Sequence, residues 1–318
     1  MTVLITGGAG FIGSQLALRL ISEQQSVVIL DNFNDYYDPT LKRANISAIE
    51  ALNGDCEVIE GDIRDEALIE DVFRTRSIQY IVHLAAMANV RYSIDRGRLY
   101  TDVNVSATVS LLDAARRHNV GNFIFGSTSS VYGNTSQIPF REDDPAIAPL
   151  APYPASKRAA ELFAQSYHHL FGLNVTVLRF FNVYGPHGRP DMMPMRAIES
   201  ILQEKPIQLF AGGHLKRDWT YIDDIVDGIV ATITRPLGYE IINLGFGSPI
   251  TLLEFIEIYE ALIGKQAVRV SVEAPTSEPF VTYCDNSRAR EVLGFNPQVP
   301  IEEGLTRTWE WYQKRSCY

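Results

Sequence analysis

Tyr153 and Lys157 are the two residues whose types and spacing most directly suggest chemistry. Four positions apart, they would lie one turn from each other on the same face of a helix. A free tyrosine has a pKa of ~10 and is a poor base at neutral pH, and lowering that pKa by about three units requires ~4 kcal/mol. An ammonium group ~4 Å away supplies about that much at an effective dielectric of ~20. We therefore predict that Lys157 makes Tyr153 a general base, and a solvent-facing pair at a helix start is the alternative.

A run of hydroxyl residues, Ser127 to Ser130, comes before this pair and follows the predicted strand Phe123–Gly126. Because the carboxyl ends of parallel strands line one crevice, Thr128 could bind the oxygen of a reacting alcohol or carbonyl there. The alternative is a turn whose hydroxyls bond its own backbone.

A glycine-rich turn, Gly7-Gly8-Ala9-Gly10-Phe11-Ile12-Gly13, follows a predicted strand and opens a predicted helix. Glycines here allow a tight turn, let backbone N–H groups approach a pyrophosphate, and let the helix pack closely on the strand. Asp31 ends the next predicted strand, where a carboxylate accepts both hydroxyls of an adenosine ribose and repels a 2′-phosphate. Asn32, rather than an arginine, follows it. The pattern predicts a bound dinucleotide and favours NAD over NADP.

Two more segments at predicted strand ends could contact the same cofactor. Asp62 could receive the adenine amino group, or it could cap the predicted helix Asp65–Arg74. The small residues after Leu84 would let a cofactor lie close to the sheet, although dense helix packing also explains them. The predicted cofactor contacts are therefore Gly7, Gly10, Phe11, Ile12, Asp31, Asn32, Asp62, Ile63, Leu84, Ala85, Ala86, Tyr153 and Lys157.

The elements that must position these residues alternate between short β-branched runs and longer helical patterns, which indicates a parallel sheet with helices on both faces. After Arg179 the elements become shorter. We predict an α/β fold: a doubly wound parallel (Rossmann) sheet with a second, smaller α/β substrate lobe. The expected cofactor domain covers 1–179 and about 219–240, and the substrate lobe covers about 180–218 and 241–318.

The composition excludes several classes of protein. Of the 318 residues, 46 % are hydrophobic and 21 % are charged, which are ordinary globular values. No apolar run approaches the ~20 residues of a membrane-spanning helix, and the first residues lack the features of a signal peptide. Because Lys and Arg number 28 against 38 Asp and Glu, the net charge of −10 argues against a nucleic-acid partner.

Neither the cysteines nor the acidic pairs predict a metal site. Cys56, Cys284 and Cys317 are scattered, without disulfide or metal-ligand spacing, which indicates a reducing, cytoplasmic setting. Asp223-Asp224 resembles a metal pair, but it starts a predicted helix, Ile225–Thr234, which it would cap. We therefore predict no metal, no nucleic-acid partner and no membrane partner.

Together these motifs resemble the extended short-chain dehydrogenase/reductase superfamily of NAD-dependent epimerases and dehydratases over nearly the whole chain. The resemblance rests on the glycine-rich turn, His83 to Ala86, Ser127 to Gly133, the Tyr153/Lys157 pair, Arg179 to Pro186 and Arg217 to Asp224.

The resemblance implies roles for individual residues. Tyr153 would be the base, assisted by Lys157, and Thr128 would occupy the Ser/Thr position of the site. Phe181 would lie near the nicotinamide of NAD. Asn182 and Arg217 would contact the diphosphate of a nucleotide sugar, here a UDP-sugar held by the substrate lobe.

The two residues after Thr128 distinguish branches of the superfamily. Nucleotide-sugar 4,6-dehydratases typically have Asp-Glu there and UDP-glucuronate decarboxylases Ser-Glu, whereas this chain has Ser129-Ser130 and no carboxylate. That favours oxidation followed by re-reduction, which is epimerisation. Segments 31–39, 90–93 and 188–192 resemble UDP-glucuronate 4-epimerases. Arg189, in the last of them, could grip an anion bidentately, or it could be a solvated loop arginine.

Departures from that branch leave the sugar open. Asn89 and His187 replace a usual Gly and Trp, and Thr276-Ser277-Glu278 replaces Pro-Gly-Asp, so that Glu278 becomes the expected acceptor for ribose hydroxyls. Asn182 stands where the branch often has Thr, and it is commoner in UDP-glucose and UDP-N-acetylhexosamine epimerases.

The leading hypothesis is NAD-dependent conversion of UDP-glucuronate to UDP-galacturonate by oxidation at C4, rotation of the 4-keto intermediate and re-reduction. Ser129 and Ser130 would contact the sugar without adding a carboxylate. UDP-glucose or UDP-N-acetylglucosamine 4-epimerisation, and a non-catalytic NAD-binding regulator, are the alternatives. The apolar stripes of the predicted helices Thr101–Arg117 and Ser156–Phe171 imply, through the resemblance, a homodimer.

Overall fold

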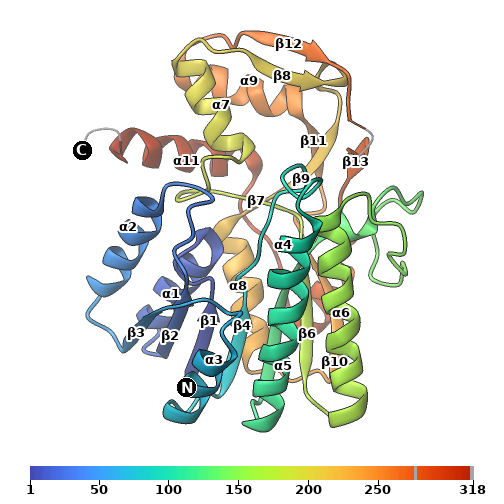
Figure 1. The fold of residues 1–318 in the computed structure, drawn as a ribbon. Coiled ribbons are helices and arrows are strands. Elements are labelled where there is room, and N and C mark those ends of the chain that lie inside the picture. The colour runs from blue at the N-terminus through green and yellow to red at the C-terminus, as the bar shows by residue number, and fades with distance from the viewer. Residues whose placement is uncertain (276–277, 316–318) are drawn as a thin grey trace.

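A parallel sheet of seven strands forms the centre of the larger part of the molecule (Figure 1). The computed structural model describes residues 1–275 and 278–315, so that Thr276, Ser277 and Cys317 lie outside the described residues. The strand order is β10-β6-β5-β4-β1-β2-β3, and all neighbours run parallel. The strands are β1 (Thr2–Thr6), β2 (Ser26–Asp31), β3 (Cys56–Glu60), β4 (Tyr80–His83), β5 (Asn122–Thr128), β6 (Val175–Phe180) and β10 (Tyr239–Leu244).

The two faces of this sheet pack against separate sets of helices. Successive side chains of a strand point to opposite faces, and in β1 Val3 and Ile5 belong to one hydrophobic core while Leu4 belongs to the other. The first core includes side chains of α1 (Phe11–Ser22), α2 (Pro39–Glu50) and α8 (Ile222–Ile233). The second includes α3 (Glu66–Thr75), α5 (Ala107–Arg117) and α6 (Pro152–Phe171). The predicted doubly wound sheet is therefore confirmed.

A smaller α/β lobe lies beyond the carboxyl ends of the strands, at the top of Figure 1. It contains a mixed sheet of β7 (Asn182–Tyr184), β9 (Lys216–Tyr221), β11 (Pro249–Thr251) and β13 (Val281–Thr282). A parallel pair, β8 (Ile207–Phe210) and β12 (Arg269–Val272), forms its outer edge. Its helices are α7 (Met193–Leu202), α9 (Leu252–Ile263) and α11 (Ile301–Arg315).

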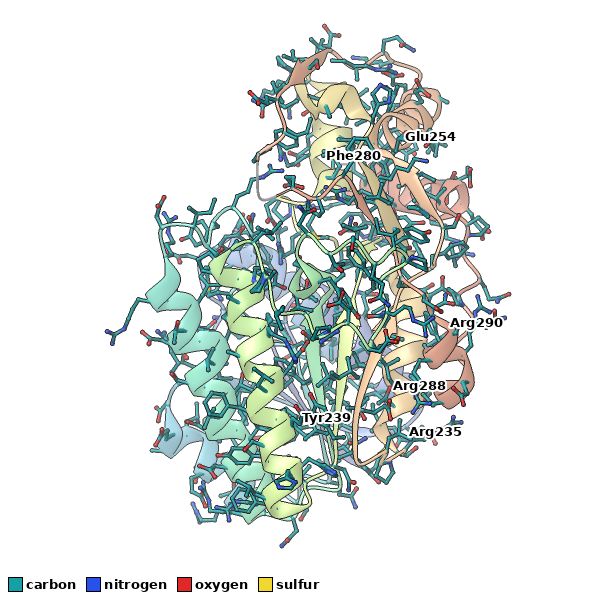
Figure 2. The ribbon with its side chains drawn as sticks, turned by 90° about the vertical axis from the view of Figure 1, so that its right-hand side faces the viewer. Arg235, Tyr239, Glu254, Phe280, Arg288 and Arg290 are labelled. Carbon is teal, nitrogen blue, oxygen red and sulfur yellow. The ribbon has the colours of Figure 1, made fainter. Side chains whose placement is uncertain are left out.

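Local sequence explains where several of these elements begin and end. Helix α9 starts at a capping box in which Thr251 and Glu254 bond each other's backbone N–H groups, and it ends at Gly264 in the left-handed conformation. Helix α10 (Ser287–Leu293) covers the β10 edge of the main sheet, where Arg288 pairs with Glu240 at 2.9 Å (Figure 2).

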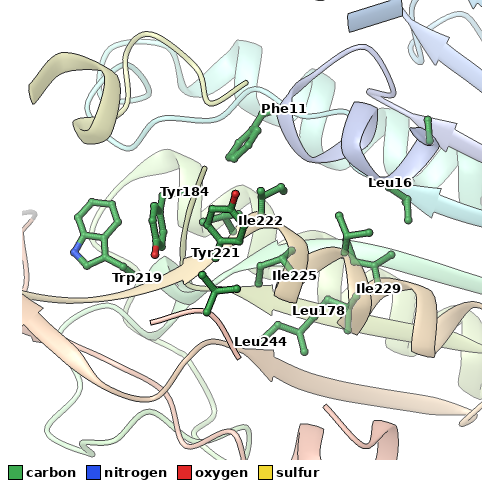
Figure 3. Packing of buried hydrophobic residues seen from close by; sticks show 14 of the residues in the cluster. Phe11, Leu16, Leu178, Tyr184, Trp219, Tyr221, Ile222, Ile225, Ile229 and Leu244 are labelled. Carbon is green, nitrogen blue, oxygen red and sulfur yellow. The ribbon is translucent and has the colours of Figure 1, made fainter. Parts of the chain in front are cut away.

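Aromatic side chains join the two parts of the molecule below the lobe (Figure 3). The Trp219 and Phe255 rings lie with their centroids 4.5 Å apart, and Tyr184 meets Tyr221 edge to face at 5.6 Å. This cluster continues into the apolar contacts of Ile225 with the sheet. The lobe is thus fixed above the strand ends that carry the hydroxyl and tyrosine motifs.

The predicted helix Thr101–Arg117 is interrupted. It consists of α4 (Gly97–Thr101), a π-helical turn over Asp102–Ser106, and α5. Asn104, inside that turn, bonds both backbone groups of Met87 at 2.9 Å and the Ser156 hydroxyl at 3.0 Å. The bulge therefore ties the loop after β4 to the start of α6.

The prediction that Asp223 and Asp224 cap a helix is wrong, because α8 begins at Ile222 and both residues lie in its first turn. Asp224 instead accepts the backbone N–H groups of Gln298 at 2.8 Å and Val299 at 3.1 Å. In the described chain no cluster of three metal-ligating side chains occurs. No helix over residues 1–275 and 278–315 is long and apolar enough to cross a bilayer.

Candidate active site

Two neighbouring cavities lie at the carboxyl ends of the parallel strands. One, the sheet cavity, has a volume of about 470 Å³ and is lined by the glycine-rich turn, the ends of β2 and β4, and Tyr153 and Lys157 of α6. The other, the lobe cavity, has a volume of about 700 Å³ and is lined by residues of α7, β8 and β9. The residues that line both cavities are Tyr92, Asn182, Arg189 and Met192.

The structure brings the residues predicted from the sequence together. All the predicted cofactor contacts, Phe181 included, line the sheet cavity, as does Thr128. The predicted sugar contacts line the lobe cavity or its junction with the sheet cavity; these are Ser129, Ser130, Asn182, Arg189, Arg217 and Glu278.

Steric contacts explain the glycines of the turn. A Cβ atom at Gly13 would lie 2.3 Å from the carbonyl oxygen of Gly7, and Gly7 itself has a φ of +70°. Asp31 stabilises the same turn, because its carboxylate accepts the backbone N–H groups of Ala9 at 3.1 Å and Phe33 at 2.9 Å. In the described chain no side chain caps the α1 N-terminus after Gly10, so its first N–H groups are available to an anion.

Asp62 is not a helix cap. The cap of α3 is Asp65, whose carboxylate accepts the N–H of Leu68 at 3.0 Å. Asp62 lines the sheet cavity instead and accepts hydrogen bonds from Asn32 at 2.9 Å and from Arg64. The Arg64 guanidinium lowers the pKa of Asp62 to about 2. Of the two interpretations of Asp62, the capping one is wrong.

Lys157 presents a charged group to the sheet cavity from an otherwise buried position. Its Nζ lies 4.3 Å from the centroid of the Phe125 ring, and among the described residues it has no hydrogen-bond partner. Burial lowers the pKa of Lys157 to about 7, and the negative charge of Glu161 offsets part of that effect. An uncapped helix N-terminus, the Asp31 carboxylate and this ammonium together fit a dinucleotide with a pyrophosphate and two riboses.

The predicted electrostatics of Tyr153 need correction. Burial raises the pKa of its phenol, whereas a hydrogen bond with Thr128 and the positive charge of Arg189 lower it. The net shift of this pKa is upward, because the cost of burying a phenolate outweighs the nearby charges, and Lys157 is not among the groups that lower it. Thr128 and Arg189, rather than Lys157, are the residues of this chain that favour the ionised phenol.

A buried network that the sequence patterns did not single out lies beneath these groups. Glu161 accepts hydrogen bonds from the Ser127 hydroxyl at 2.5 Å and from Arg179 at 3.1 Å and 2.7 Å. Glu161 thereby joins the ends of β5 and β6 to α6. Its partner Ser127 directly precedes Thr128, and Glu161 itself lies one helical turn after Lys157. Two features of the sequence point to this network: Glu161 lies one helical turn beyond Lys157, and Arg179 lies inside an apolar strand.

In the lobe cavity, Glu278 bridges two arginines. Its carboxylate accepts from Arg217 at 2.9 Å and from Arg91 at 2.7 Å. The Arg91 guanidinium also lies 4.7 Å from the centroid of the Phe210 ring. Arg91 belongs to the resembling segment 90–93, and its pairing with Glu278, 187 positions away, depends on the folded lobe. The cavity therefore has a cationic wall suited to a diphosphate.

Comparisons with known proteins agree with this geometry. Residues 3–245 match the model of the NAD dependent epimerase/dehydratase family. A UDP-glucuronate 4-epimerase from Thermodesulfobacterium geofontis is 44 % identical over 309 residues, covering 97 % of this chain and 95 % of that protein.

Two solved structures are also similar. The UDP-glucuronic acid 4-epimerase from Bacillus cereus, in complex with UDP-glucuronic acid and NAD, has a TM-score of 0.92 and 34 % identity, covering 99 % of this chain and all of that one (100 %). The UDP-glucose 4-epimerase from Thermotoga maritima with UDP-glucose has a TM-score of 0.89 and 29 % identity, with 99 % and 100 % covered. This chain belongs to the NAD dependent epimerase/dehydratase family.

Proposed function

We propose that this protein is an NAD-dependent 4-epimerase that converts UDP-glucuronate to UDP-galacturonate. The observation that carries the proposal is the placement of Arg189 where the two cavities meet, with Ser129 and Ser130 in the lining of the lobe cavity. The two residues after Thr128 thus bring hydroxyl groups, and no carboxylate, to the site. A guanidinium and two hydroxyls can bind a C5 carboxylate without repelling it. The relatives named above support the choice of substrate.

The sheet cavity would hold NAD. The N–H groups after Gly10 would bind the pyrophosphate, Asp31 and Lys157 would each bind a ribose, and Asp62 would bind the adenine amino group. When bound, NAD accepts a hydride from C4 of the sugar and later returns it. The domain formed by residues 1–179 and about 219–240 would thus bind the cofactor. Its second segment is better extended from residue 240 to Leu244, where β10 ends.

Tyr153, as phenolate, would take the proton of the 4-hydroxyl, and it would give the proton back when the ketone is reduced. The Thr128 hydroxyl would hold the same oxygen, because it lines the sheet cavity together with Tyr153. Arg217 would hold the diphosphate while the 4-keto sugar turns about its phosphate linkage within the 700 Å³ cavity. Once the sugar has turned, the opposite face of C4 faces the reduced cofactor, and return of the hydride to that face gives the epimer.

A neutral UDP-hexose is the second candidate substrate. Asn182 favours it, because this amide lines both cavities and can bond neutral hydroxyls. Arg189 opposes it, because a half-buried guanidinium facing a neutral sugar gains no ionic contact with that sugar.

We also propose a cytoplasmic homodimer. Several apolar side chains on α6 are exposed, namely Leu162, Phe163, Leu170 and Phe171. Helix α6 runs beside α5 on one face of the molecule (Figure 2). Burial of these side chains against the same helices of a second copy would remove apolar surface from water. Sedimentation equilibrium tests this, and a monomer at micromolar concentration would contradict it.

The function is tested by incubating the protein with UDP-glucuronate and resolving the products by chromatography. UDP-galacturonate without net NADH supports the proposal, whereas a UDP-pentose or no turnover contradicts it. Tyr153→Phe should abolish turnover while NAD remains bound, and Tyr167→Phe, on the same helix but away from both cavities, is the control. Turnover by the Tyr153 variant would place the base elsewhere.

A further inference from the structure

Asp191 holds Arg189 in one orientation at the junction of the two cavities. Nε of Arg189 donates to Oδ1 of Asp191 and Nη2 donates to Oδ2, both at 2.9 Å. Among residues 1–275 and 278–315, the third guanidinium nitrogen, Nη1, has no hydrogen-bond partner. A bidentate pair fixes the plane of the guanidinium. The pair thus leaves one nitrogen of Arg189 for a ligand.

Asp191 is itself held by two distant segments of the chain. The Tyr36 hydroxyl, from the loop after β2, donates to Oδ2 of Asp191 at 2.9 Å. The Asn89 amide, from the loop after β4, donates to the same oxygen at 3.2 Å and to the Tyr36 hydroxyl at 2.8 Å. Asp191 therefore has two neutral donors besides Arg189, and they fix its carboxylate in the position from which it holds the guanidinium.

Asn89 is adapted to this task. Its φ of +79° lies in the left-handed region, where glycine is favoured and asparagine is better tolerated than most residues. A glycine would fit the same backbone, but it could supply neither of the two hydrogen bonds that the amide makes. The side chain at this position thus contributes to the hold on Asp191.

The pairing also changes what a ligand encounters. Asp191 neutralises Arg189, so an anionic sugar meets an oriented N–H donor in place of an unpaired cation. Paired charged groups of this kind contribute more to the specificity of a site, through the placement of their donors, than to its affinity for an anion. A C5 carboxylate placed at Nη1 would accept a charge-assisted hydrogen bond from Arg189, whereas a neutral hydroxymethyl group would supply no negative charge there.

Given the proposed function, we propose that Asp191 is a positioning residue for uronate specificity: it aims the free nitrogen of Arg189 at the C5 substituent of the UDP-sugar, and Tyr36 and Asn89 hold it in place. Asp191 acts through Arg189 and does not touch the reacting atoms.

A double-mutant cycle on the whole enzyme tests this inference. Asp191→Asn should lower kcat/KM for UDP-glucuronate by about tenfold or more, through kcat, with KM equal or lower because Arg189 is no longer neutralised. Once Arg189→Gln is present, adding Asp191→Asn should change kcat/KM by less than about twofold, because the two residues act as one unit. Effects that multiply, an effect on KM alone, or no effect of Asp191→Asn would each overturn the proposal.

Further variants keep the test decisive. If Asp191→Asn does not fold, Tyr36→Phe removes one donor to Asp191 without changing a charge and should lower kcat in the same direction, again only while Arg189 is present. Asp71→Asn is the matched control, since it breaks the exposed pair with Arg74 on α3. If the wild-type enzyme does not turn over UDP-glucuronate, the proposed function fails. Calorimetric binding of UDP-glucuronate to the same variants then tests the role of Asp191 separately. Tighter binding by Asp191→Asn that is lost once Arg189→Gln is added supports the inference, and any other pattern overturns it.

Discussion

Arg179 and Glu161 form an ion pair with both side chains fully buried, Nη2 of the arginine lying 2.7 Å from Oε2 of the glutamate. The pair lies beneath the strand end that carries Thr128, and Glu161 also accepts the Ser127 hydroxyl. Removing two charges from water is costly, so such a pair is retained only where its geometry and additional hydrogen bonds repay the cost. Here the pair fixes the relative placement of β5, β6 and α6.

Glu161→Gln should therefore destabilise the fold by about 3–5 kcal/mol, because it leaves the Arg179 charge buried without a counter-charge. Urea unfolding followed by circular dichroism measures this free energy. Glu60→Gln breaks an exposed pair with Arg43 and should cost only about 0–1 kcal/mol. Equal effects of the two substitutions would show that the buried pair does not stabilise the protein.

The sequence was sufficient to predict the parallel sheet and the residues of its strand-end motifs that line the two cavities, because both follow from local patterns. A glycine turn after a strand, an acid at the end of β2 and a Tyr–Lys pair on α6 each fix one residue relative to one element. Parallel strands then bring these elements to a common edge. The predicted residues consequently lie around one cavity although they are far apart in the sequence.

Contacts between segments distant in sequence were not predictable in this way. The partners of Asp191 come from the loops that hold Tyr36 and Asn89, and nothing local links these three residues. Asp62 and Asp65 both follow β3, and only the observed start of α3 shows which one is the cap. The pKa of Tyr153 was mispredicted because a spacing gives the distance to Lys157 but not the extent of burial.

The stability of the protein should depend on the protonation of Lys157. Its pKa falls from the ordinary value of 10.5 to about 7 on folding. Between these two values the unfolded chain holds a proton that the folded chain has released, so this group makes the folded state more stable as the pH rises. Below about pH 7 both states hold the proton, and the folded state bears the full cost of a buried ammonium.

Lys157→Met should consequently raise the free energy of unfolding at about pH 6 by on the order of 5 kcal/mol, and this gain should shrink as the pH approaches 10. Urea unfolding of both proteins across that range measures the difference. A gain that stays constant with pH would mean that burial does not shift the titration of Lys157.

Asp31 should determine the choice of cofactor. Its carboxylate faces the sheet cavity and would repel a 2′-phosphate while accepting ribose hydroxyls. Asp31→Asn should reduce the preference for NAD over NADP by about tenfold or more, which is ~1.4 kcal/mol of differential binding. Calorimetric titration of both cofactors tests this, with Asp71→Asn as the control. An unchanged ratio would remove Asp31 from cofactor recognition.

Thr128 should tune the base as well as hold the substrate oxygen. Its hydrogen bond lowers the pKa of Tyr153, whose burial has the opposite effect. Because a tyrosine must be deprotonated to act as a base, catalysis should rise with pH as the phenol ionises. Thr128→Val removes the hydrogen bond and raises the pKa of Tyr153, so the rising limb of kcat/KM should move to higher pH. Thr128→Ser keeps the hydroxyl and should leave the limb in place. If the valine variant lowers the rate equally at every pH, Thr128 acts on the substrate alone and the pKa of Tyr153 is set by the remaining residues around it.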